Sequence, residues 1–239
     1  MKKINLILII LILSTLISSC STNAGKIIDG YTQIGNLKLE QVQSPKKGEE
    51  IAIIITNMGE IKIRLFPEIA PKAVENFKAL AKEGFYKGVK FSRVEENFLI
   101  QIGENKDFPE GKSIFGDFYE DEVDLNYRHI TGCVGLAKRE ENKNSSQFYI
   151  IVQDGIDEEY LEVMKELDEE GYPREVIEAY EVFGGVPRLD LQYTIFGQVF
   201  YGMDTVIGIN QVDVNPITKE PVDDVIIEKI EIVPYEGDI

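Results

Sequence analysis

One cation stands among apolar side chains between residues 91 and 103, a run that reads FSRVEENFLIQIG. That cation is Arg93, and Gln101 supplies a neutral amide near the end of the run. A guanidinium keeps its proton at any ordinary pH, so burying it among apolar groups is costly. Two interpretations are open on this run alone. Arg93 is either a strand-edge side chain that reaches solvent or an acidic partner, or a charge kept there to act on a bound molecule.

The composition narrows the chemistry in which Arg93 can take part. The chain has 239 residues, with one His, no Trp, and two Cys, Cys20 and Cys133. A metal site built from several His is therefore excluded, and any catalytic triad would have to use His129. We expect neither a metal ion nor another cofactor. His129 follows Arg128 in a predicted loop, and nothing in that position indicates a function.

The net charge restricts the partners. The chain carries 25 Lys and Arg against 42 Asp and Glu, a formal charge of −17 at pH 7. A surface this acidic repels phosphate backbones, so nucleic acid is not an expected partner. We expect a monomer.

The pattern of apolar residues predicts strands with short connections, and few helices. Residues 51–56 and 61–66 read as a hairpin, and a helix follows that begins at Pro71 and is capped near Gly84. Further strands are predicted at 132–137, 147–152, 193–199 and 225–233, and a short helix at 203–209. Strands in this number favour a mainly β fold, an antiparallel closed or nearly closed barrel.

Residues 154–188 differ from the rest. Two apolar helical faces, separated by Gly171 and Pro173, predict a helical insertion with an acidic outer side. It is either an inert decoration packed on the barrel or a contact surface for a partner.

The N-terminus has the proportions of an export signal. A basic start is followed by an apolar run at 6–17, which is too short to span a membrane comfortably. The run ends in Leu16-Ile17-Ser18-Ser19-Cys20, which resembles a bacterial lipobox. The resemblance implies a signal peptide at 1–19, cleavage before Cys20 and lipid attached to its sulfur. An ordinary secretory signal with a chance Cys is the alternative.

Residues 20–50 then read as a tether, with a possible short strand at 37–42, and the domain proper as 51–235. A lipid on Cys20 would hold an exported domain at the outer face of the cell membrane, or at the outer membrane of a two-membrane cell. It would also leave Cys133, a predicted buried strand residue, as the one thiol.

Several stretches in order resemble the cyclophilin peptidyl-prolyl isomerases: GEIKIRLFPEIAPKAVENF, GFYKGVKFSRV, NFLIQIG, SSQFYI and YTIFGQVFYGMD. The resemblance runs from about residue 51 to 233, apart from the helical insertion. It implies a closed eight-stranded antiparallel barrel, capped by helices, with a groove for Xaa-Pro peptides on its outer face.

The resemblance also assigns the residues of the groove. The family's catalytic arginine falls on Arg93, and Gln101 is expected to orient it. The substrate-binding residues fall on Phe98, Leu99, Ala137, Lys138, Gln147, Tyr149, Leu189 and Tyr193. The chain departs from the family where a groove Trp aligns near Arg188, where Tyr193 replaces a His, and in an altered loop after Ile102.

The chemistry of such a groove can be argued from the amide itself. Twisting an Xaa-Pro bond breaks its resonance, at a barrier of about 18–20 kcal/mol, and returns a lone pair to the nitrogen. A fixed donor such as Arg93 would bind the twisted form better than either planar form, which is catalysis. We therefore expect an isomerase that assists the folding of exported, proline-containing polypeptides. A non-catalytic proline-peptide-binding module at the cell surface is the alternative.

Overall fold

The computed structural model describes residues 25–102, 105–108, 111–167 and 171–237. The predicted signal peptide and Cys20 lie outside these residues. Within them, no helix has the length and apolar character needed to cross a membrane.

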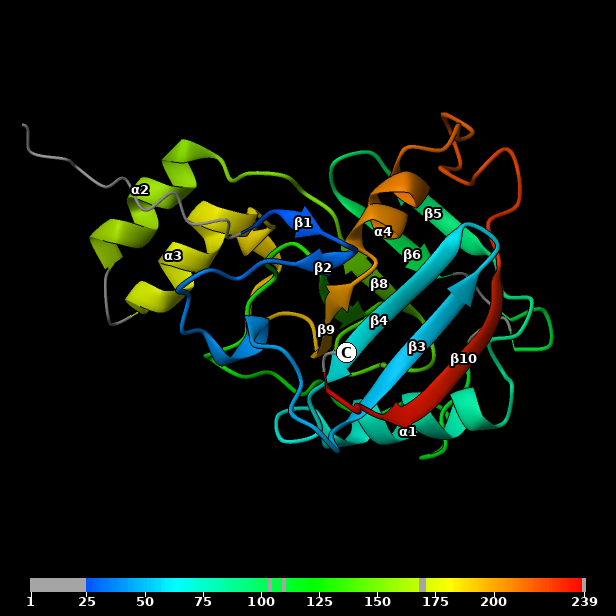
Figure 1. The fold of residues 1–239 in the computed structure, drawn as a ribbon. Coiled ribbons are helices and arrows are strands. Elements are labelled where there is room, and N and C mark those ends of the chain that lie inside the picture. The colour runs from blue at the N-terminus through cyan, green and yellow to red at the C-terminus, as the bar shows by residue number, and fades with distance from the viewer. Residues whose placement is uncertain (1–24, 103–104, 109–110, 168–170, 238–239) are drawn as a thin grey trace, which may run out of the picture.

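A curved antiparallel sheet forms the body of the domain (Figure 1). Its strands follow the order β10-β3-β4-β9-β7-β8-β6-β5. Their bounds are β3 Glu50–Thr56, β4 Gly59–Leu65, β5 Phe91–Glu95, β6 Leu99–Ile102, β7 Cys133–Leu136, β8 Phe148–Ile151, β9 Ile195–Tyr201 and β10 Ile227–Pro234. The strands predicted from residue 51 onward are present to within a few residues, and Cys133 is a buried strand residue, as predicted.

The two ends of this sheet do not pair with each other as strands. A single bridge joins Lys90 to Ile226, and the N–H of Phe91 donates to the carbonyl of Val225 at 2.9 Å. Both contacts involve residues at or before the first residues of β5 and β10, so no ladder extends along the two strands. The closed eight-stranded barrel is therefore not confirmed. The structure shows a curled, open antiparallel sheet.

Helix α1, Pro71–Lys82, is present as predicted, with Pro71 in its first turn, and its buried side chains join the main core. Its Phe77 is 1% exposed and lies among the rings of Tyr86, Phe148 and Phe196, with centroid distances of 5.3–5.6 Å. Gly84 follows the helix with φ 75°, a backbone angle that favours glycine. Helix α4, Met203–Asn210, covers another part of the core.

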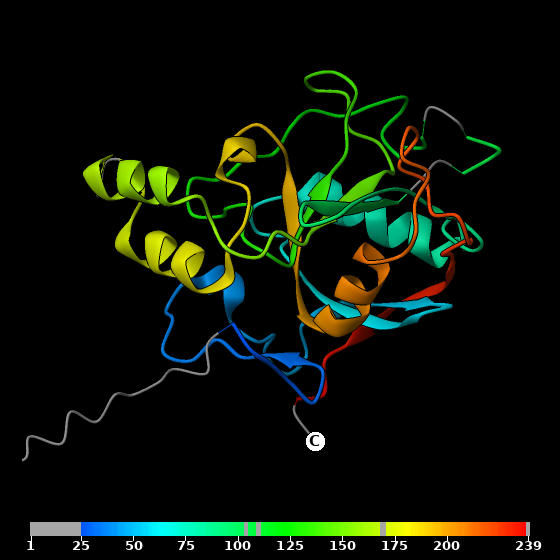
Figure 2. The ribbon, with the colours of Figure 1, turned by 90° about the horizontal axis from the view of Figure 1, so that it is seen from above.

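A second apolar cluster lies to one side of the sheet, around helices α2, Glu158–Leu167, and α3, Arg174–Phe183 (Figure 2). The N-terminal residues join it through Leu39 and Val42, which are both 7% exposed. Strands β1, Ile27–Ile28, and β2, Tyr31–Thr32, also lie against the domain, with Tyr31 opposite Tyr201 of β9.

Residues 25–50 are therefore not the free tether that their polarity predicts. The expected strand at 37–42 is instead a short 3-10 helix, η1, Glu40–Val42. Gln41 of this helix is 1% exposed, and it exchanges hydrogen bonds with the backbone of Arg128 at 2.8 Å. The tether prediction was wrong because polar side chains that bond to a domain have the same composition as a flexible linker.

Replacing Phe77 by alanine should lower the free energy of unfolding by about 3–5 kcal/mol, because it removes a ring from the centre of the core. Urea unfolding followed by circular dichroism measures the change. Leu125→Ala is the matched control, since Leu125 is 66% exposed and should change stability by less than about 0.5 kcal/mol. Equal losses for the two variants would contradict this account of the core.

Candidate active site

Strand register brings the predicted site residues into one row. Arg93 of β5 lies opposite Gln101 of β6, Gln101 lies opposite Tyr149 of β8, and Tyr149 lies opposite Gly135 of β7. Directly paired residues of neighbouring strands point to the same face of a sheet. The row therefore places the cation, the amide and the aromatic ring side by side.

A cavity of about 570 Å³ opens on this row. Its lining contains all ten residues that the sequence predicts for the groove: Arg93, Phe98, Leu99, Gln101, Ala137, Lys138, Gln147, Tyr149, Leu189 and Tyr193. Residues from five separate parts of the chain thus meet at one hollow.

The apolar part of the cavity is formed by buried side chains. Leu99 is 3% exposed and Tyr149 is 4% exposed, and both belong to one apolar cluster with Phe98, Leu189 and Tyr193 at its edge. A slot of this kind can take up a small apolar ring such as that of proline and exclude water around it.

Arg93 is held mainly by Glu95, a residue that is not among the ten predicted for the groove. Its Nε donates to Oε1 of Glu95 at 2.6 Å, and its Nη2 also contacts that oxygen. Nη1 lies 3.5 Å from Oε1 of Gln101, a long contact, so Gln101 is at most a weak support. The signal in the sequence was the spacing of two residues, which places Glu95 on the same face of the strand as Arg93.

The environment of Arg93 has features of both interpretations: a side chain that reaches solvent or an acidic partner, and a charge kept at a binding site. Its side chain is 41% exposed and paired with an acid, yet its guanidinium also lies over the ring of Phe98, 5.8 Å from the centroid. The charge is therefore accessible at the cavity, and Nη1 is the nitrogen that Glu95 leaves available.

The second missed residue is His129, which is completely buried beneath the cavity. Its Nε2 lies 2.8 Å from the hydroxyl of Tyr149, and its Nδ1 lies 3.1 Å from Oδ1 of Asp190. The carboxylate also accepts from the hydroxyl of Tyr180 at 2.8 Å. This arrangement assigns the Nδ1 proton to the bond with Asp190 and leaves Nε2 to accept from Tyr149. Burial raises the pKa of the Tyr149 hydroxyl, which stays a neutral donor.

The edge of the cavity at Lys138 depends on Asp121. The ammonium of Lys138 contacts Oδ2 of Asp121, Asn144 donates to Oδ1 at 2.7 Å, and the N–H of Asn142 donates to Oδ2 at 3.1 Å. Burial acts to raise the pKa of this carboxyl, but the bonds from Lys138, Asn144 and Asn142 outweigh it and lower the pKa below its usual value.

This lowered pKa predicts a loss of stability in acid. A carboxylate whose pKa is lower in the folded state stabilises the fold above its unfolded pKa, about 3.9, and loses that effect as the pH falls through the folded value. The difference in unfolding free energy between the wild type and Asp121→Asn should therefore be largest above about pH 5 and shrink below about pH 4. Urea unfolding across this range measures it, with the exposed Asp117→Asn as control. A difference that is constant with pH would contradict the role of Asp121.

Comparison with known proteins agrees with this geometry. The sequence model of the family described as "Cyclophilin type peptidyl-prolyl cis-trans isomerase/CLD" matches residues 51–232. A putative peptidyl-prolyl cis-trans isomerase of Staphylococcus aureus (strain COL) is 38% identical over 188 residues, covering 78% of this chain and 93% of that protein. One of Staphylococcus saprophyticus is 38% identical over 195 residues, covering 81% and 97%.

Solved structures give the same result. A cyclophilin type peptidyl-prolyl cis-trans isomerase of Cryptosporidium parvum superposes with a TM-score of 0.61 at 27% identity, covering 78% of this chain and 98% of that chain. A second structure of that protein, in the presence of the dipeptide ala-pro, gives the same TM-score and identity and covers 77% and 99%. The chain belongs to the cyclophilin-type peptidyl-prolyl cis-trans isomerase family.

Proposed function

We propose that this isomerase binds proline-containing segments of exported polypeptides in the cavity over β5, β6 and β8, and speeds their folding there. The observation that carries the proposal is the meeting of all ten predicted groove residues at one hollow of about 570 Å³. The Cryptosporidium parvum structure in the presence of ala-pro supports a proline peptide as the occupant.

In the proposed mechanism the apolar slot holds the proline ring, and Arg93 acts on the amide nitrogen. Leu99 and Tyr149 supply the buried floor of the slot, and Phe98 stands beside the guanidinium. Glu95 takes Nε and Nη2, so Nη1 is left to donate to the lone pair that appears on the nitrogen as the bond twists. A planar amide offers no such lone pair, and the donor therefore stabilises the transition state selectively.

Replacing Arg93 by alanine should lower kcat/KM on an Ala-Pro peptide by about 100-fold or more, the effect of removing a fixed donor from a transition state. Exchange spectroscopy of the cis and trans peptide signals measures the rate. Arg93→Lys keeps the charge and loses the planar fork, so it should recover only part of the activity.

Peptide binding is the matched control for these variants. If Arg93→Ala still binds the peptide and accelerates exchange like the wild type, Arg93 has no catalytic role. If the wild type binds the peptide and leaves exchange at its spontaneous rate, the chain is a non-catalytic binding module.

The place of action is proposed from the N-terminal sequence. A signal peptide at 1–19, a lipid on Cys20 and a folded domain at 51–235 would put the enzyme on the outer face of the cell membrane, or on the outer membrane of a two-membrane cell. The first described residue, Gly25, is five positions after Cys20, and residues 25–50 lie against the domain. The anchor would therefore hold the domain close to the lipid surface.

Mass spectrometry of the mature N-terminus tests the anchor. We expect cleavage before Cys20 and a mass increase that corresponds to a diacylglyceryl group, both lost in Cys20→Ser. An unmodified Cys20, or cleavage at another residue, would remove the anchor from this account and leave the isomerase function unaffected.

A further inference from the structure

The cavity over Arg93 is one of three adjoining hollows that share lining residues. A hollow of about 660 Å³ shares Gln101 and Gln147 with it, and a smaller one of about 240 Å³ shares Ala137, Lys138, Arg139 and Gln147. We call the three together the groove region. A polypeptide lying over Gln147 can therefore contact all three.

The charge of the groove region is opposite to that of the chain. Eight basic side chains line it: Lys87, Lys90, Arg93, Lys106, Lys138, Arg139, Lys143 and Arg188. Among the described residues, four acidic side chains line it: Glu95, Asp107, Glu140 and Glu220. The whole chain has 25 basic and 42 acidic residues, so bases are gathered here and acids are depleted.

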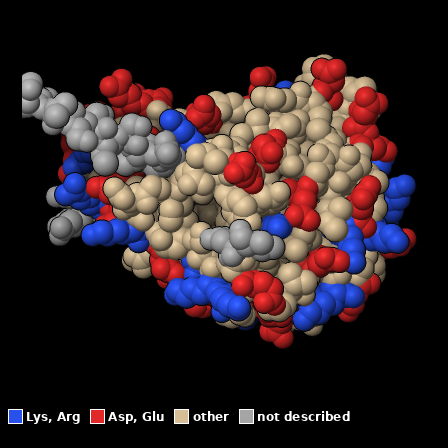
Figure 3. Space-filling view, in the orientation of Figure 1, with Lys and Arg blue, Asp and Glu red and all other residues tan. Residues whose placement is uncertain are grey.

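The opposite face provides a comparison. On the side that carries β3, β4 and β10, acidic and basic side chains are interspersed, and no basic patch dominates (Figure 3). The excess of bases in the groove region is thus not repeated on this face.

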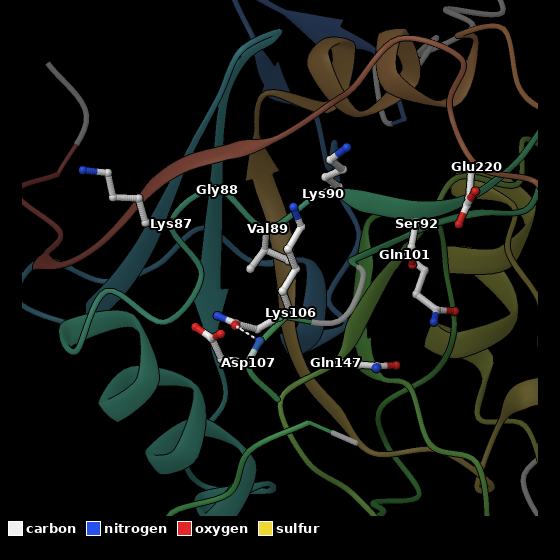
Figure 4. Close-up of a pocket in the computed structure, with 11 residues that line it drawn as sticks. Lys87, Gly88, Val89, Lys90, Ser92, Gln101, Lys106, Asp107, Gln147 and Glu220 are labelled. Atoms are coloured by element: carbon white, nitrogen blue, oxygen red, sulfur yellow. Dashed lines mark hydrogen bonds between the residues drawn. The ribbon is translucent and has the colours of Figure 1, made fainter. Parts of the chain in front are cut away.

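Several of these cations already have partners. Arg93 is paired with Glu95, Lys138 with Asp121, and Lys90 with Asp224. Arg188 and Lys106 form no ion pair with any residue in the described ranges. Lys87 forms no ion pair with the described residues either, but its side chain points away from Gln101 and Gln147 (Figure 4). Arg188 and Lys106 are therefore the charges near the proline slot that are available to a ligand.

Arg188 is placed to meet such a ligand at the edge of the proline slot. Its guanidinium lies over the ring of Phe98, 4.7 Å from the centroid, and Phe98 also contacts the guanidinium of Arg93. A stacked guanidinium keeps its N–H edges free and its plane fixed, the arrangement that suits a carboxylate. Lys106 lines the larger hollow, which is drawn in Figure 4 and shares Gln101 and Gln147 with the proline slot.

We propose that the groove region prefers proline segments in which Asp or Glu flanks the Xaa-Pro pair, and that Arg188 is the residue that reads the flanking carboxylate. Lys106 reinforces the preference from the larger hollow. This inference rests on the proposed isomerase function and specifies its substrate class. Neutral proline segments remain substrates, because the slot for the ring is apolar.

Three peptides that differ in one respect test the proposal: Ala-Pro flanked on both sides by Glu, by Gln or by Lys. The values of kcat/KM from exchange spectroscopy should fall in that order. At low ionic strength the Glu peptide should exceed the Gln peptide by about two- to fivefold, the range expected of partly exposed ion pairs. The ratio should approach one at high salt, because salt screens exposed charges.

Variants of Arg188 and Lys106 test whether these residues cause the preference for the Glu peptide. The ratio of Glu to Gln peptide should fall in Arg188→Gln and in Lys106→Gln, and Arg188→Lys should keep part of it. Using the ratio removes any general effect of a variant on the groove. Lys47→Gln is the matched control, since Lys47 is exposed, lies outside the groove region and changes the net charge equally. Its ratio should equal that of the wild type.

The outcomes separate this proposal from the function on which it rests. An enzyme that accelerates the Gln peptide but gives a ratio of one or less overturns the charge preference and leaves the isomerase function standing. A wild-type preference that Arg188→Gln does not reduce overturns the role of Arg188. An enzyme that accelerates none of the three peptides overturns both the preference and the function.

Discussion

The register of β5, β6 and β8 is the constraint on which the site depends. Because Arg93, Gln101 and Tyr149 are direct partners in two neighbouring ladders, the cation, the amide and the ring share one face of the sheet. A shift of one residue in β6 would turn Gln101 to the opposite face and Ile100 or Ile102 to the groove. Ile100 and Ile102 are at most 1% exposed and belong to the main core, so such a shift would bury the polar amide and expose them. The packing that stabilises the domain therefore also fixes the geometry of the site.

The floor of the groove depends on a second, polar constraint. Tyr149 is tied through His129 to Asp190, and the side chain of Asp190 is 5% exposed and lies next to Arg128 and Tyr180. Gln41 of the N-terminal segment bonds to the backbone of Arg128, so residues 25–50 take part in supporting this layer. Buried polar groups are costly unless they are bonded to each other, and this network satisfies most of them across four separate parts of the chain. The helical insertion is thus connected to this layer through Tyr180, whose hydroxyl donates to Asp190.

Much of this arrangement could be predicted from the sequence, for physical reasons that differ between elements. Alternating apolar and polar side chains predict β4, and Pro71 predicts the start of α1, because both depend on neighbouring residues only. The order of the family motifs identifies the ten groove residues. Glu95 and His129 are site residues that local sequence patterns do not identify. The partner of Arg93 depends on a side-chain rotamer, and the burial of His129 depends on Asp190, which lies 61 positions away. Residues 25–50 resemble a tether because their side chains form polar bonds with partners that are distant in the sequence. The extent of sheet closure depends on where the strands end, which hydrophobic periodicity does not determine.

The central claim is that a proline peptide lies on the row formed by Arg93, Gln101 and Tyr149, with Nη1 of Arg93 at the prolyl nitrogen. A titration of the isotope-labelled protein with an Ala-Pro peptide, followed by nuclear magnetic resonance, tests it most directly. The side-chain signals of Arg93, Gln101 and Gln147 and the amide of Tyr149 should shift together along one saturation curve. Signals of residues at the opposite face, such as Ile53 and Lys229, should not move. Saturable shifts at a different part of the surface, with the groove signals unchanged, would contradict the account.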